Sequence, residues 1–357
     1  MKQYILTAGW KPAAGNAFQK ARSDVEQLAL KQGLEAFAMH APQTAGGNRL
    51  RQLWLMAACL LDWLRLWARV EKGAMVFCQY PMYPVKAGGL IRRMIRWIAG
   101  SKHIAFVALV HDLDSLRGID GKGALANDQH LLPVFDLILC HNARMKAHLC
   151  AQGIAAEKLI ELGLFDYVTS VPRTQVTCSA SLNIAGNLSP EKCGYLYPLL
   201  DKPPCMMHLY GKGLVAGVEH AQVVYHGMVP AEELPAQLQG AFGLVWDGDS
   251  AETCAGEFGL YLRYNNPHKA SLYLAAGIPL IVWEDSALAD QVRQGGYGLC
   301  IGSLLTLREV LEAVTPAQYA AMAGKARNIG EELREGRHFG QAYAEALRRT
   351  MQSRATA

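Results

Sequence analysis

The stretch from Phe242 to Trp283 constrains the fold of this chain more than any other part of the sequence. Its first segment, Phe242–Trp246, is a short apolar run of the kind that forms a buried strand, and a Gly-containing turn follows it. The leucines and alanines of His268–Ala276 favour a helix, and Ile278–Trp283 is a second apolar run. A strand, a helix and a strand in this order predict a βαβ unit of a parallel sheet.

The start of the predicted helix offers a binding place for an anion. Asn266 is placed to cap the helix, and Pro267 suits its first turn. Ligands bind parallel sheets outside the carboxyl ends of the strands, and the N–H groups and dipole of a helix start favour an anion there. Lys269 adds a full charge, and His268 and Ser271 lie beside it. We therefore expect the diphosphate of a nucleotide here, with a capped helix and a solvated lysine as the alternative.

Length, composition and cysteine pattern together limit the class of protein. With 357 residues the chain is long enough for two domains of about 150 residues each. Hydrophobic residues make up 51% and charged residues 18%, which is typical of a chain with a large core. The nine cysteines form no CxxC pair, so we expect reduced thiols in a cytoplasmic protein rather than a zinc site or a disulfide framework. Residues 1–6 hold no signal-peptide core and are interpreted as a first strand.

Charge is distributed unevenly along the chain. The formal net charge is +4, yet residues 1–170 hold 20 Lys and Arg against 13 Asp and Glu, while the remainder hold 15 and 18. A basic first half and an acidic second half indicate different partners, and an anionic membrane surface or acceptor suits the first half. We expect no nucleic acid partner.

A strongly apolar helix is expected over Asn48–Glu71. Charged residues interrupt it, which argues against a membrane span. A helix that faces the core is the simplest interpretation. The alternative is that this helix lies on an anionic bilayer together with the basic, Trp-bearing Ile91–Trp97, which would place the protein at the inner face of the membrane.

Residues 1–170 alternate strands and helices, the pattern of a doubly wound α/β domain. The first strand opens into a Gly-containing loop that ends at Gly15 and Asn16, and such a loop lets the backbone approach a ligand, although it is not a GxGxxG motif. Strands are expected at Gln3–Thr7, Glu35–Met39, Met75–Gln79, Ile104–Val110 and Asp136–Cys140, and helices at Asn16–Gln32, Asn48–Glu71, Val85–Trp97 and Ala143–Gln152.

The segment Val107–Gly118 carries the most reactive side chains of the first half. An apolar strand delivers His111 and Asp112 at its carboxyl end, where parallel sheets bind ligands. A histidine or a carboxylate there can act as general base toward an acceptor hydroxyl. The alternatives are a strand-end histidine tucked into the core and an aspartate that caps a helix. Asp114 and Arg117 follow at a spacing that fits a simple i,i+3 ion pair.

The alternation of predicted strands and helices is interrupted between Phe165 and Cys178, and we place the domain boundary there. The final segment, Pro316–Met351, exceeds one ordinary helix, and Gly330 and Gly336 are expected to break it. In between, strands are expected from Leu182 to the Gly186-Asn187 pair, over Met206–Tyr210 and over Val223–Tyr225, and helices after Ser189-Pro190, over Ala231–Gln239, over Ser286–Gln294 and over Leu304–Val314.

Several short motifs occur in one order along the chain. They are HDLDSLRG at 111–118, GNLS at 186–189, LYGKG at 209–213, LVWDG at 244–248, PHKAS at 267–271, GIP at 277–279 and SALA at 286–289. A chain with these motifs resembles a bacterial family that holds β-1,6-galactofuranosyltransferases of O-antigen synthesis and the glucosyltransferase that extends glycans on serine-rich adhesins. The resemblance runs from residue 111 to about residue 303.

The resemblance implies a GT-B glycosyltransferase, an α/β protein with two Rossmann-like domains that face a cleft. It implies an acceptor-side domain over residues 1–170, a domain over 171–335 that binds the nucleotide sugar, and a helix over 336–357 that crosses back to the first domain. Such enzymes need no metal ion, because helix dipoles and basic side chains offset the diphosphate charge. A UDP-sugar is the implied donor substrate, with no further cofactor, and the relatives are often homo-oligomers.

By the same resemblance a set of side chains would contact the nucleotide. The diphosphate contacts fall on Asn187, Tyr210, Lys269 and Ser271, with Asn266 and His268 shaping the loop and with Gly15 and Asn16 closing from the first domain. Relatives often carry a basic residue shortly after the Gly-Asn pair, where this chain has Pro190 and then Lys192. The second glutamate of many retaining GT-B enzymes is missing, since Leu272 occupies its position, and this favours an inverting mechanism.

The residues and the resemblance together predict a hexosyltransferase. A hexose (galactofuranose, glucose or galactose) would pass from a UDP-sugar to a hydroxyl of a bacterial surface glycan, such as lipopolysaccharide, or of a lipid-linked saccharide. Asp112 or His111 would take the acceptor proton, and Lys269 would stabilise the departing diphosphate. Asp114 and Arg117 would serve the acceptor or the structure. Two alternatives stay open: a non-catalytic subunit that binds nucleotide sugar or glycan, and a sugar-nucleotide epimerase of the same architecture.

Overall fold

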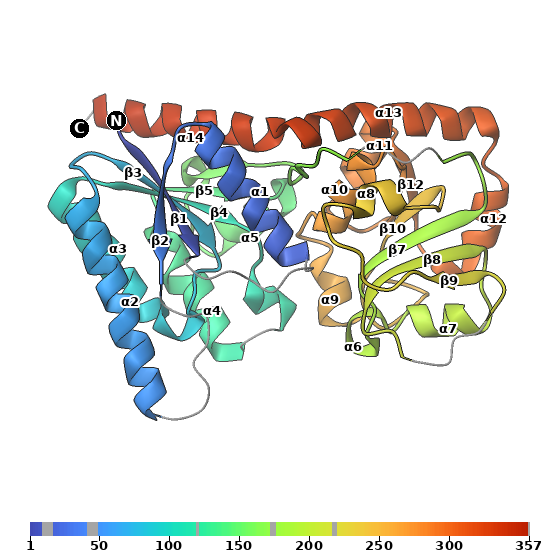
Figure 1. Ribbon diagram of the computed structural model, residues 1–357, viewed down its shortest axis with the longest axis horizontal. Coiled ribbons are helices and arrows are strands. Elements are labelled where there is room, and N and C mark those ends of the chain that lie inside the picture. Colours follow the sequence, from blue (N-terminus) through green and yellow to red (C-terminus); the bar gives the residue numbers. More distant parts are fainter. Residues whose placement is uncertain (9–16, 41–48, 119–120, 172–175, 216–219, 356–357) are drawn as a thin grey trace. The chain divides into compact units, whose positions relative to one another are not determined.

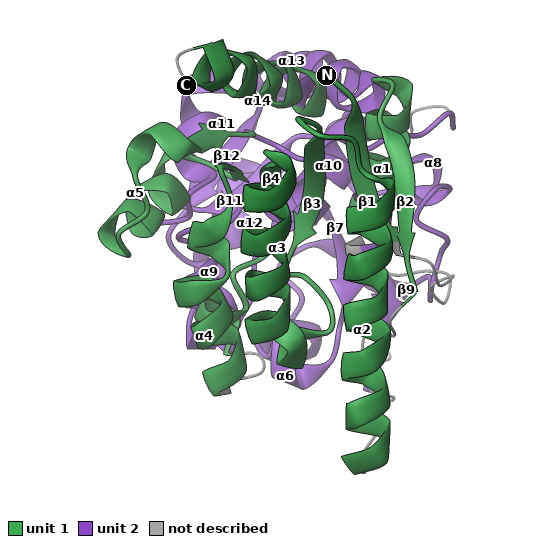
Figure 2. Cartoon of the chain, turned by 90° about the vertical axis from the view of Figure 1, so that its left-hand side faces the viewer, with its two compact units in different colours: residues 1–12, 22–162, 339–357 green, residues 13–21, 163–338 purple. Residues whose placement is uncertain are grey.

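The computed structural model describes residues 1–8, 17–40, 49–118, 121–171, 176–215 and 220–355. The chain divides into two compact units, which Figure 2 colours separately. Unit 1 comprises Met1–Pro12, Arg22–Leu162 and Phe339–Ala357, and unit 2 comprises Ala13–Ala21 and Gly163–His338. Each unit is built on a six-stranded parallel sheet of its own, flanked by helices (Figure 1), which confirms the predicted doubly wound α/β class.

In the sheet of unit 1 the six-residue strands β3 (Met75–Tyr80) and β4 (Ala105–Val110) lie side by side. Both are buried along their whole length, as expected of parallel strands that are covered on both faces. The strands are β1 (Gln3–Ala8), β2 (Glu35–Met39), β3 (Met75–Tyr80), β4 (Ala105–Val110), β5 (Leu137–Cys140) and β6 (Leu159–Glu161), in the order β2-β1-β3-β4-β5-β6. The direction of winding reverses between β1 and β3.

Four of the first five helices that the structure describes along the chain were predicted from the sequence. They are α1 (Ala17–Lys31), α2 (Arg49–Arg69), α3 (Gly88–Lys102), α4 (Gly121–His130) and α5 (Ala143–Ala151), with 3₁₀ turns η1 (Val85–Ala87), η2 (Asp114–Arg117), η3 (Leu132–Val134) and η4 (Ala156–Lys158). The helix that was not predicted is α4, because its sequence GKGALANDQH has two glycines and no apolar stripe. At the start of α5, Asn142 accepts a hydrogen bond from Met145 N at 3.0 Å.

The inner face of α2 is part of the core, as the simplest interpretation of its sequence required. Leu55, Cys59, Trp63 and Leu66 are buried on this face. Within the part of the chain that the structure describes, no helix has both the length and the apolar character that a membrane crossing demands.

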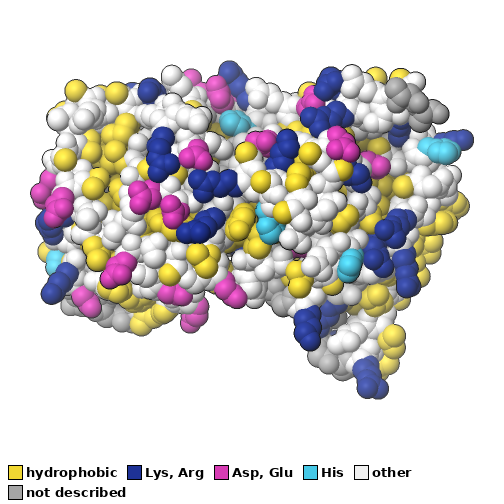
Figure 3. Space-filling view, turned by 180° about the vertical axis from the view of Figure 1, so that it is seen from behind, with side chains coloured by type: hydrophobic (Ala, Val, Ile, Leu, Met, Phe, Trp, Pro, Cys, Tyr) yellow, Lys and Arg dark blue, Asp and Glu magenta, His cyan; other side chains and the backbone are white. Residues whose placement is uncertain are grey.

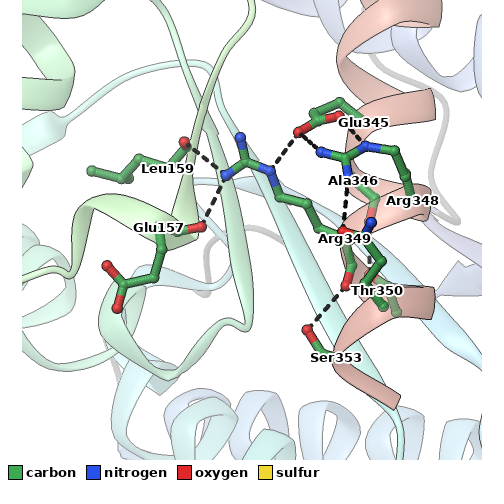
Figure 4. A network of polar contacts seen from close by, with 9 residues as sticks. Glu157, Leu159, Glu345, Ala346, Arg348, Arg349, Thr350 and Ser353 are labelled. Atoms are coloured by element: carbon green, nitrogen blue, oxygen red, sulfur yellow. Dashed lines mark hydrogen bonds and ion pairs between the residues drawn. The ribbon is translucent and has the colours of Figure 1, made fainter. Parts of the chain in front are cut away.

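The C-terminal helix α14 (Arg337–Ala355) packs on unit 1 from residue 339 onward. The ring of Phe339 lies 5.6 Å from that of Phe77 in β3, in an edge-to-face arrangement. Further along, the Arg349 guanidinium donates to the backbone carbonyl of Glu157 at 2.9 Å, as Figure 4 shows. Aromatic packing and carbonyl contacts together attach the last helix to the sheet of unit 1.

The sheet of unit 2 contains the βαβ unit from which the sequence was interpreted. Its strands are β7 (Ser181–Asn187), β8 (Met206–Lys212), β9 (Val223–Tyr225), β10 (Phe242–Val245), β11 (Leu280–Trp283) and β12 (Gly298–Ile301). Their order is β12-β11-β10-β7-β8-β9, so the direction of winding reverses between β7 and β10. The helix between β10 and β11 is α10 (His268–Ala275), and β10 pairs in parallel with β11, which confirms the predicted unit.

The helix predictions in unit 2 were wrong in two places. The helix expected over residues 231–239 is reduced to α8 (Leu234–Gln237), where Pro235 occupies the first turn. In addition, the segment between β10 and α10, for which no helix was predicted, contains the short helix α9 (Gly256–Tyr261). The other helices are α6 (Pro190–Cys193), α7 (Leu196–Asp201), α11 (Ala289–Gly295), α12 (Leu307–Glu312) and α13 (Pro316–Glu335), with a 3₁₀ turn η5 (Leu304–Thr306).

Only one of the two expected breaks in the long C-terminal segment is present. Gly336 ends α13 with a positive φ of 78°, as predicted. Gly330 continues the helix, so its predicted break was wrong. A Cβ at this position would lie 2.1 Å from the carbonyl oxygen of Leu274, and the glycine is therefore needed where α13 passes against the backbone of α10.

Candidate active site

The unit 2 site lies at the carboxyl ends of β7 and β10, where the strand order of the sheet reverses. β7 ends at Asn187, and β10 runs into Trp246 and Asp247. The turn after β10 is bonded to α6, because Gly248 N donates to Lys192 O at 3.1 Å. Doubly wound sheets bind ligands at such a reversal. The structure thus brings Asn187 and Lys192 to the edge where a nucleotide is expected.

Lys269 forms a buried ion pair with Asp247 at this edge. Its Nζ lies 2.8 Å from Asp247 Oδ1 and 3.0 Å from Trp246 O. The two side chains are only 13% and 9% exposed. Burial acts to lower the pKa of Lys269, but Asp247 together with Cys193 and Tyr273 outweighs burial and the pKa is raised, so the ammonium stays charged. Lys269 was predicted to add a full positive charge, whereas the Asp247 carboxylate largely offsets that charge.

Asp247 was not among the predicted site residues, since it lies in the Gly-containing turn that follows the first apolar run. It precedes Lys269 by 22 positions, and the two meet because α10 packs against β10. An ammonium has three N–H donors. Two of them face Asp247 and Trp246, which leaves one donor for a phosphate oxygen.

The start of α10 is not capped as predicted. Pro267 is the N-cap residue, with an extended backbone (φ −65°, ψ 138°), so it lies outside the first turn. Asn266 is one residue too early to cap the helix; it is buried and its Nδ2 donates to Gly163 O at 2.9 Å. Because a proline side chain accepts no hydrogen bond, the first N–H groups of α10 have no capping side chain at the N-cap position.

His268, the first residue of α10, is a neutral acceptor. Its ring stacks on Tyr167 at 5.1 Å. Burial, and next the charge of Lys20, lower the pKa of His268 to about 3. The residue retains some exposed surface, yet its Nε2 is buried and has no hydrogen-bond partner among the described residues. The imidazole therefore presents a lone pair rather than a positive charge.

The remaining predicted nucleotide contacts differ in how available they are. The Tyr210 hydroxyl donates to Gln237 O at 2.9 Å and accepts from Gln239 N at 3.1 Å, and so it is used within unit 2. Ser271 is 1% exposed inside α10. Asn187 is exposed at the end of β7. Gly15 and Asn16 lie outside the described residues.

The unit 1 site lies at the carboxyl ends of β3 and β4. His111 follows β4, is only 6% exposed, and has its Nε2 2.7 Å from Gln79 Oε1. Gln79 Nε2 in turn donates to Glu26 Oε1 at 3.2 Å. Because the Gln79 oxygen can only accept, His111 carries its proton on Nε2 in this arrangement. The interpretation of His111 as a tucked strand-end histidine fits this burial.

Asp112 is joined to Arg117 beside the histidine. The Arg117 Nη1 lies 2.8 Å from Asp112 Oδ2 and 3.3 Å from Asp114 Oδ1, which confirms the predicted i,i+3 pair and adds a second carboxylate to it. The side chains of Asp112 and Arg117 are 19% and 20% exposed. Asp112 does not cap the 3₁₀ turn η2, whose N-cap residue is Leu113. The carboxylate is therefore fixed in place yet reachable from solvent.

Two further residues of the unit 1 site gave no signal in the sequence. Arg22 of α1 donates to Pro81 O at 2.7 Å and stacks over the Tyr83 ring at 5.3 Å. Burial lowers the pKa of Arg22, while Tyr83 and Asp112 oppose that shift. α1 resembles any amphipathic helix, and only the tertiary structure brings its arginine to these carboxylates.

The second unpredicted residue of the unit 1 site is Asp128 of α4, which accepts hydrogen bonds from the Tyr80 hydroxyl and the Ser115 hydroxyl. Burial raises the pKa of Asp128. Its contacts hold η2, and with it Arg117, against the end of β3. Among the described residues no group of three or more His, Cys, Asp or Glu side chains is arranged to hold a metal ion.

Comparison with known proteins agrees with this architecture. Residues 3–164 match the family described as glucosyltransferase 3-like, N-terminal domain, and residues 182–346 match its C-terminal domain. The β-1,6-galactofuranosyltransferase WbbI of Escherichia coli K12 is 33% identical over 249 residues, which are 68% of this chain and 71% of that protein. Glucosyltransferase 3 of Streptococcus gordonii is 26% identical over 64% of this chain and 67% of its own length.

Solved structures show the same fold at low sequence identity. Anabaena HepE in complex with UDP aligns with a TM-score of 0.60 and 14% identity, over 97% of this chain and 99% of that chain. The lipopolysaccharide outer core galactosyltransferase WaaB aligns with a TM-score of 0.57 and 14% identity, over 97% and 100%.

Two doubly wound parallel sheets with this likeness define the GT-B fold. The chain belongs to the glucosyltransferase 3-like family. The resemblance drawn from the motifs at residues 111–118 and 267–271 is thereby confirmed, as is the assignment of the chain to the transferases.

Proposed function

We propose that the chain transfers a hexose from a UDP-sugar to a hydroxyl of a bacterial surface glycan. The observation that carries this proposal is the unit 2 site, where a charged lysine and an uncapped helix start lie at the reversal of strand order. The relatives support it: WbbI is named a galactofuranosyltransferase, and HepE was solved with UDP. Galactofuranose, glucose and galactose are the candidate sugars.

The diphosphate would be held by the first N–H groups of α10 and by the remaining N–H donor of Lys269. Asp247 fixes the ammonium in advance, so little reorganisation is needed as charge develops on the leaving diphosphate. Lys192 and Asn187 would add contacts from the neighbouring β7–α6 turn. Positive groups supplied by the chain would take the part of a metal ion, and transfer that survives chelation with EDTA is the expected result.

Of the two candidate bases, the geometry favours Asp112. His111 is nearly buried and its Nε2 proton is directed at Gln79. Asp112 retains 19% of its side-chain surface, so an acceptor hydroxyl can reach it, and Arg117 orients it. A carboxylate in this role suits a single inverting displacement, in which the acceptor proton passes to Asp112 as the oxygen attacks the anomeric carbon. Leu272, at the position of the retaining glutamate, is 5% exposed and apolar.

Transfer by the purified chain alone tests the proposal. We expect a UDP-hexose to be consumed in the presence of a glycan or lipid-linked acceptor, with UDP released and the anomeric configuration inverted by NMR. A chain that binds UDP but turns over no UDP-hexose would instead be a non-catalytic subunit. Conversion of the donor without an acceptor would indicate an epimerase. The expected homo-oligomer stays a prediction, which light scattering of the purified chain tests.

A further inference from the structure

The helix α2 is apolar on two opposite faces. Its inner face, which includes Trp63 and Leu66, is buried in the core of unit 1. Its other face bears large apolar side chains that are far more exposed than is usual: Leu50 is 75%, Leu53 67% and Trp54 60% exposed. Figure 2 shows the N-terminal half of α2 extending past the neighbouring helices α3 and α4 of unit 1, so neither of these two described helices covers this part.

The exposed apolar residues form one continuous stripe, which we call the outer stripe. It consists of Leu50, Leu53, Trp54, Leu60, Leu61 and Leu64, all 38% or more exposed. At about 100° per residue these positions fall within about 120° of the helix circumference, opposite the buried face. The outer stripe contains no charged residue. A patch of this length on a helix surface is typical of an interaction surface rather than of ordinary solvent exposure.

The charge beside the outer stripe is of one sign. The sequences of α2 and α3 contain eight Lys and Arg residues and a single acidic residue, Asp62. Asp62 is buried, and its Oδ1 lies 3.4 Å from Arg65 Nη1. On the face seen in Figure 3, the projecting part of unit 1 at the lower right carries basic and apolar groups together, without an acidic group. A partner of the outer stripe therefore meets positive charge at its edges.

Two tryptophans join α2 to α3 at the other end of this surface. The rings of Trp67 and Trp97 stack at 5.2 Å and are 37% and 44% exposed. The Lys102 ammonium lies 5.0 Å from the Trp67 ring. Half-exposed tryptophans beside basic side chains are the composition of an interfacial helix, since indole rings favour the boundary between apolar and aqueous phases.

We propose that the outer stripe of α2 docks unit 1 on an anionic phospholipid bilayer, with α2 lying in the plane of the surface. The leucines and Trp54 would enter the boundary of the acyl chains, and the arginines of α2 and α3 would contact lipid phosphates. A second copy of the chain is a poorer occupant, because two such stripes placed together would also bring arginines together with no carboxylate between them. The proposal stands on α2 and α3 and does not depend on the donor or the mechanism proposed above.

Vesicle flotation of the full chain tests this proposal. Wild-type protein should float with vesicles that contain phosphatidylglycerol and remain unbound with vesicles of phosphatidylcholine alone. The double variant Leu53→Gln/Leu61→Gln should lose about tenfold or more in affinity for the anionic vesicles, since both side chains are exposed and enter the bilayer in the proposed complex. The matched control, Leu260→Gln/Leu305→Gln, changes two leucines of unit 2 that are 48% and 63% exposed, and should bind as wild type.

The electrostatic contribution to vesicle binding is tested with Arg51→Gln/Arg93→Gln, which changes one exposed arginine of α2 and one of α3. We expect about tenfold weaker binding and a smaller dependence on salt, because basic residues near an anionic surface each contribute to affinity. Arg263→Gln/Arg293→Gln in unit 2 is the control, and circular dichroism confirms that all variants are folded.

Three results would overturn the proposal. They are absence of binding to anionic vesicles at low salt, equal binding by the leucine variant and its control, and a wild-type dimer that dissociates in the leucine variant. The last result would show that a second copy covers the outer stripe.

Discussion

At the unit 2 site the Lys269 ammonium and the Asp247 carboxylate are buried against one another, whereas at the unit 1 site Asp112 and Arg117 keep 19% and 20% of their side chains exposed. Both sites lie at the carboxyl ends of parallel strands, and both pair one lysine or arginine with a carboxylate. They differ in access to solvent. A buried pair keeps its charges and positions when a ligand arrives, and an exposed carboxylate can be reached by a reactant.

This difference in exposure suits the unit 2 site to binding an anion and the unit 1 site to accepting a proton. In unit 2 the Lys269 ammonium, held by Asp247, and the uncapped N–H groups at the start of α10 form a preorganised set of donors that suits an anion. In unit 1 the Asp112 carboxylate can accept a proton, and Arg117 and Arg22 place positive charge beside it. Each of the following experiments changes one side of this comparison and leaves the other intact.

The largest effect is expected for Asp112→Asn. Loss of a general base slows a reaction by roughly 10²–10⁴-fold. The kcat of transfer should fall by about this factor, while the UDP affinity measured by calorimetry stays at the wild-type value. Asp285→Asn, which changes an exposed carboxylate of unit 2, serves as control. A His111→Gln variant that loses as much kcat as Asp112→Asn loses would reverse the choice of base.

Lys269→Met is expected to affect both stability and binding. It leaves the nearly buried Asp247 without its partner, which costs about 3–5 kcal/mol of folding free energy. The double variant Lys269→Met/Asp247→Asn should regain most of that stability in urea unfolding and still bind UDP weakly. The exposed Lys212→Ala serves as control and should be close to wild type in both assays. Full UDP affinity in the double variant would remove Lys269 from the nucleotide site.

A substitution in α13 where it packs against α10 should lower the stability of the protein. Gly330→Ala places a methyl group 2.1 Å from the Leu274 carbonyl oxygen and should destabilise the protein by about 1–3 kcal/mol. Gly324→Ala on the same helix meets only the end of the Arg327 side chain, at 3.8 Å, and should stabilise slightly because alanine favours helices over glycine. Thermal unfolding of the two variants measures the difference. Equal melting temperatures would mean that α13 does not support α10 closely.

Stability is also expected to depend on pH, through one buried histidine in each unit. Burial lowers the pKa of His268 to about 3 and that of His141 in unit 1 to about 4. Both values lie below the unfolded value of about 6.5, so the unfolded chain binds more protons in this window and stability falls as the pH drops from 6.5 toward 4. His268→Asn and His141→Asn should each reduce the slope of stability against pH. An unchanged slope in either variant would mean that its histidine is charged in the folded protein.

The strands and most helices were predictable because their signals are local. The apolar runs of β3, β4, β10 and β11 mark buried parallel strands, and Gly336 adopts the positive φ that ends a helix. The same local rules misled at Gly330, where the reason for glycine is the neighbouring backbone of α10. They also misplaced the cap of α10, since a proline after Asn266 can stand at the N-cap or in the first turn and the sequence does not distinguish the two.

The sequence predicted some residues of each candidate site but not the charged partners of those residues. Asp112 and Lys269 follow a strand or open a helix, and the order of strands and helices is enough to place them at the edge of a sheet. Their partners depend on tertiary contacts across many residues: Asp247 is 22 positions from Lys269, and Arg22 approaches Asp112 from α1. No spacing rule connects such pairs. The sequence therefore indicated which residues carry the chemistry, and the structure adds which charges are offset.

The central claim is that the unit 2 site binds a nucleoside diphosphate, and thermal unfolding with UDP, GDP, dTDP and UMP tests it most directly. A ligand that binds only the folded chain raises its melting temperature. We expect UDP to raise it more than the other nucleotides, and the Lys269→Met/Asp247→Asn variant to lose that increase. No shift with any nucleotide, or the same shift in the variant, would contradict the claim and would leave the start of α10 as an ordinary helix end.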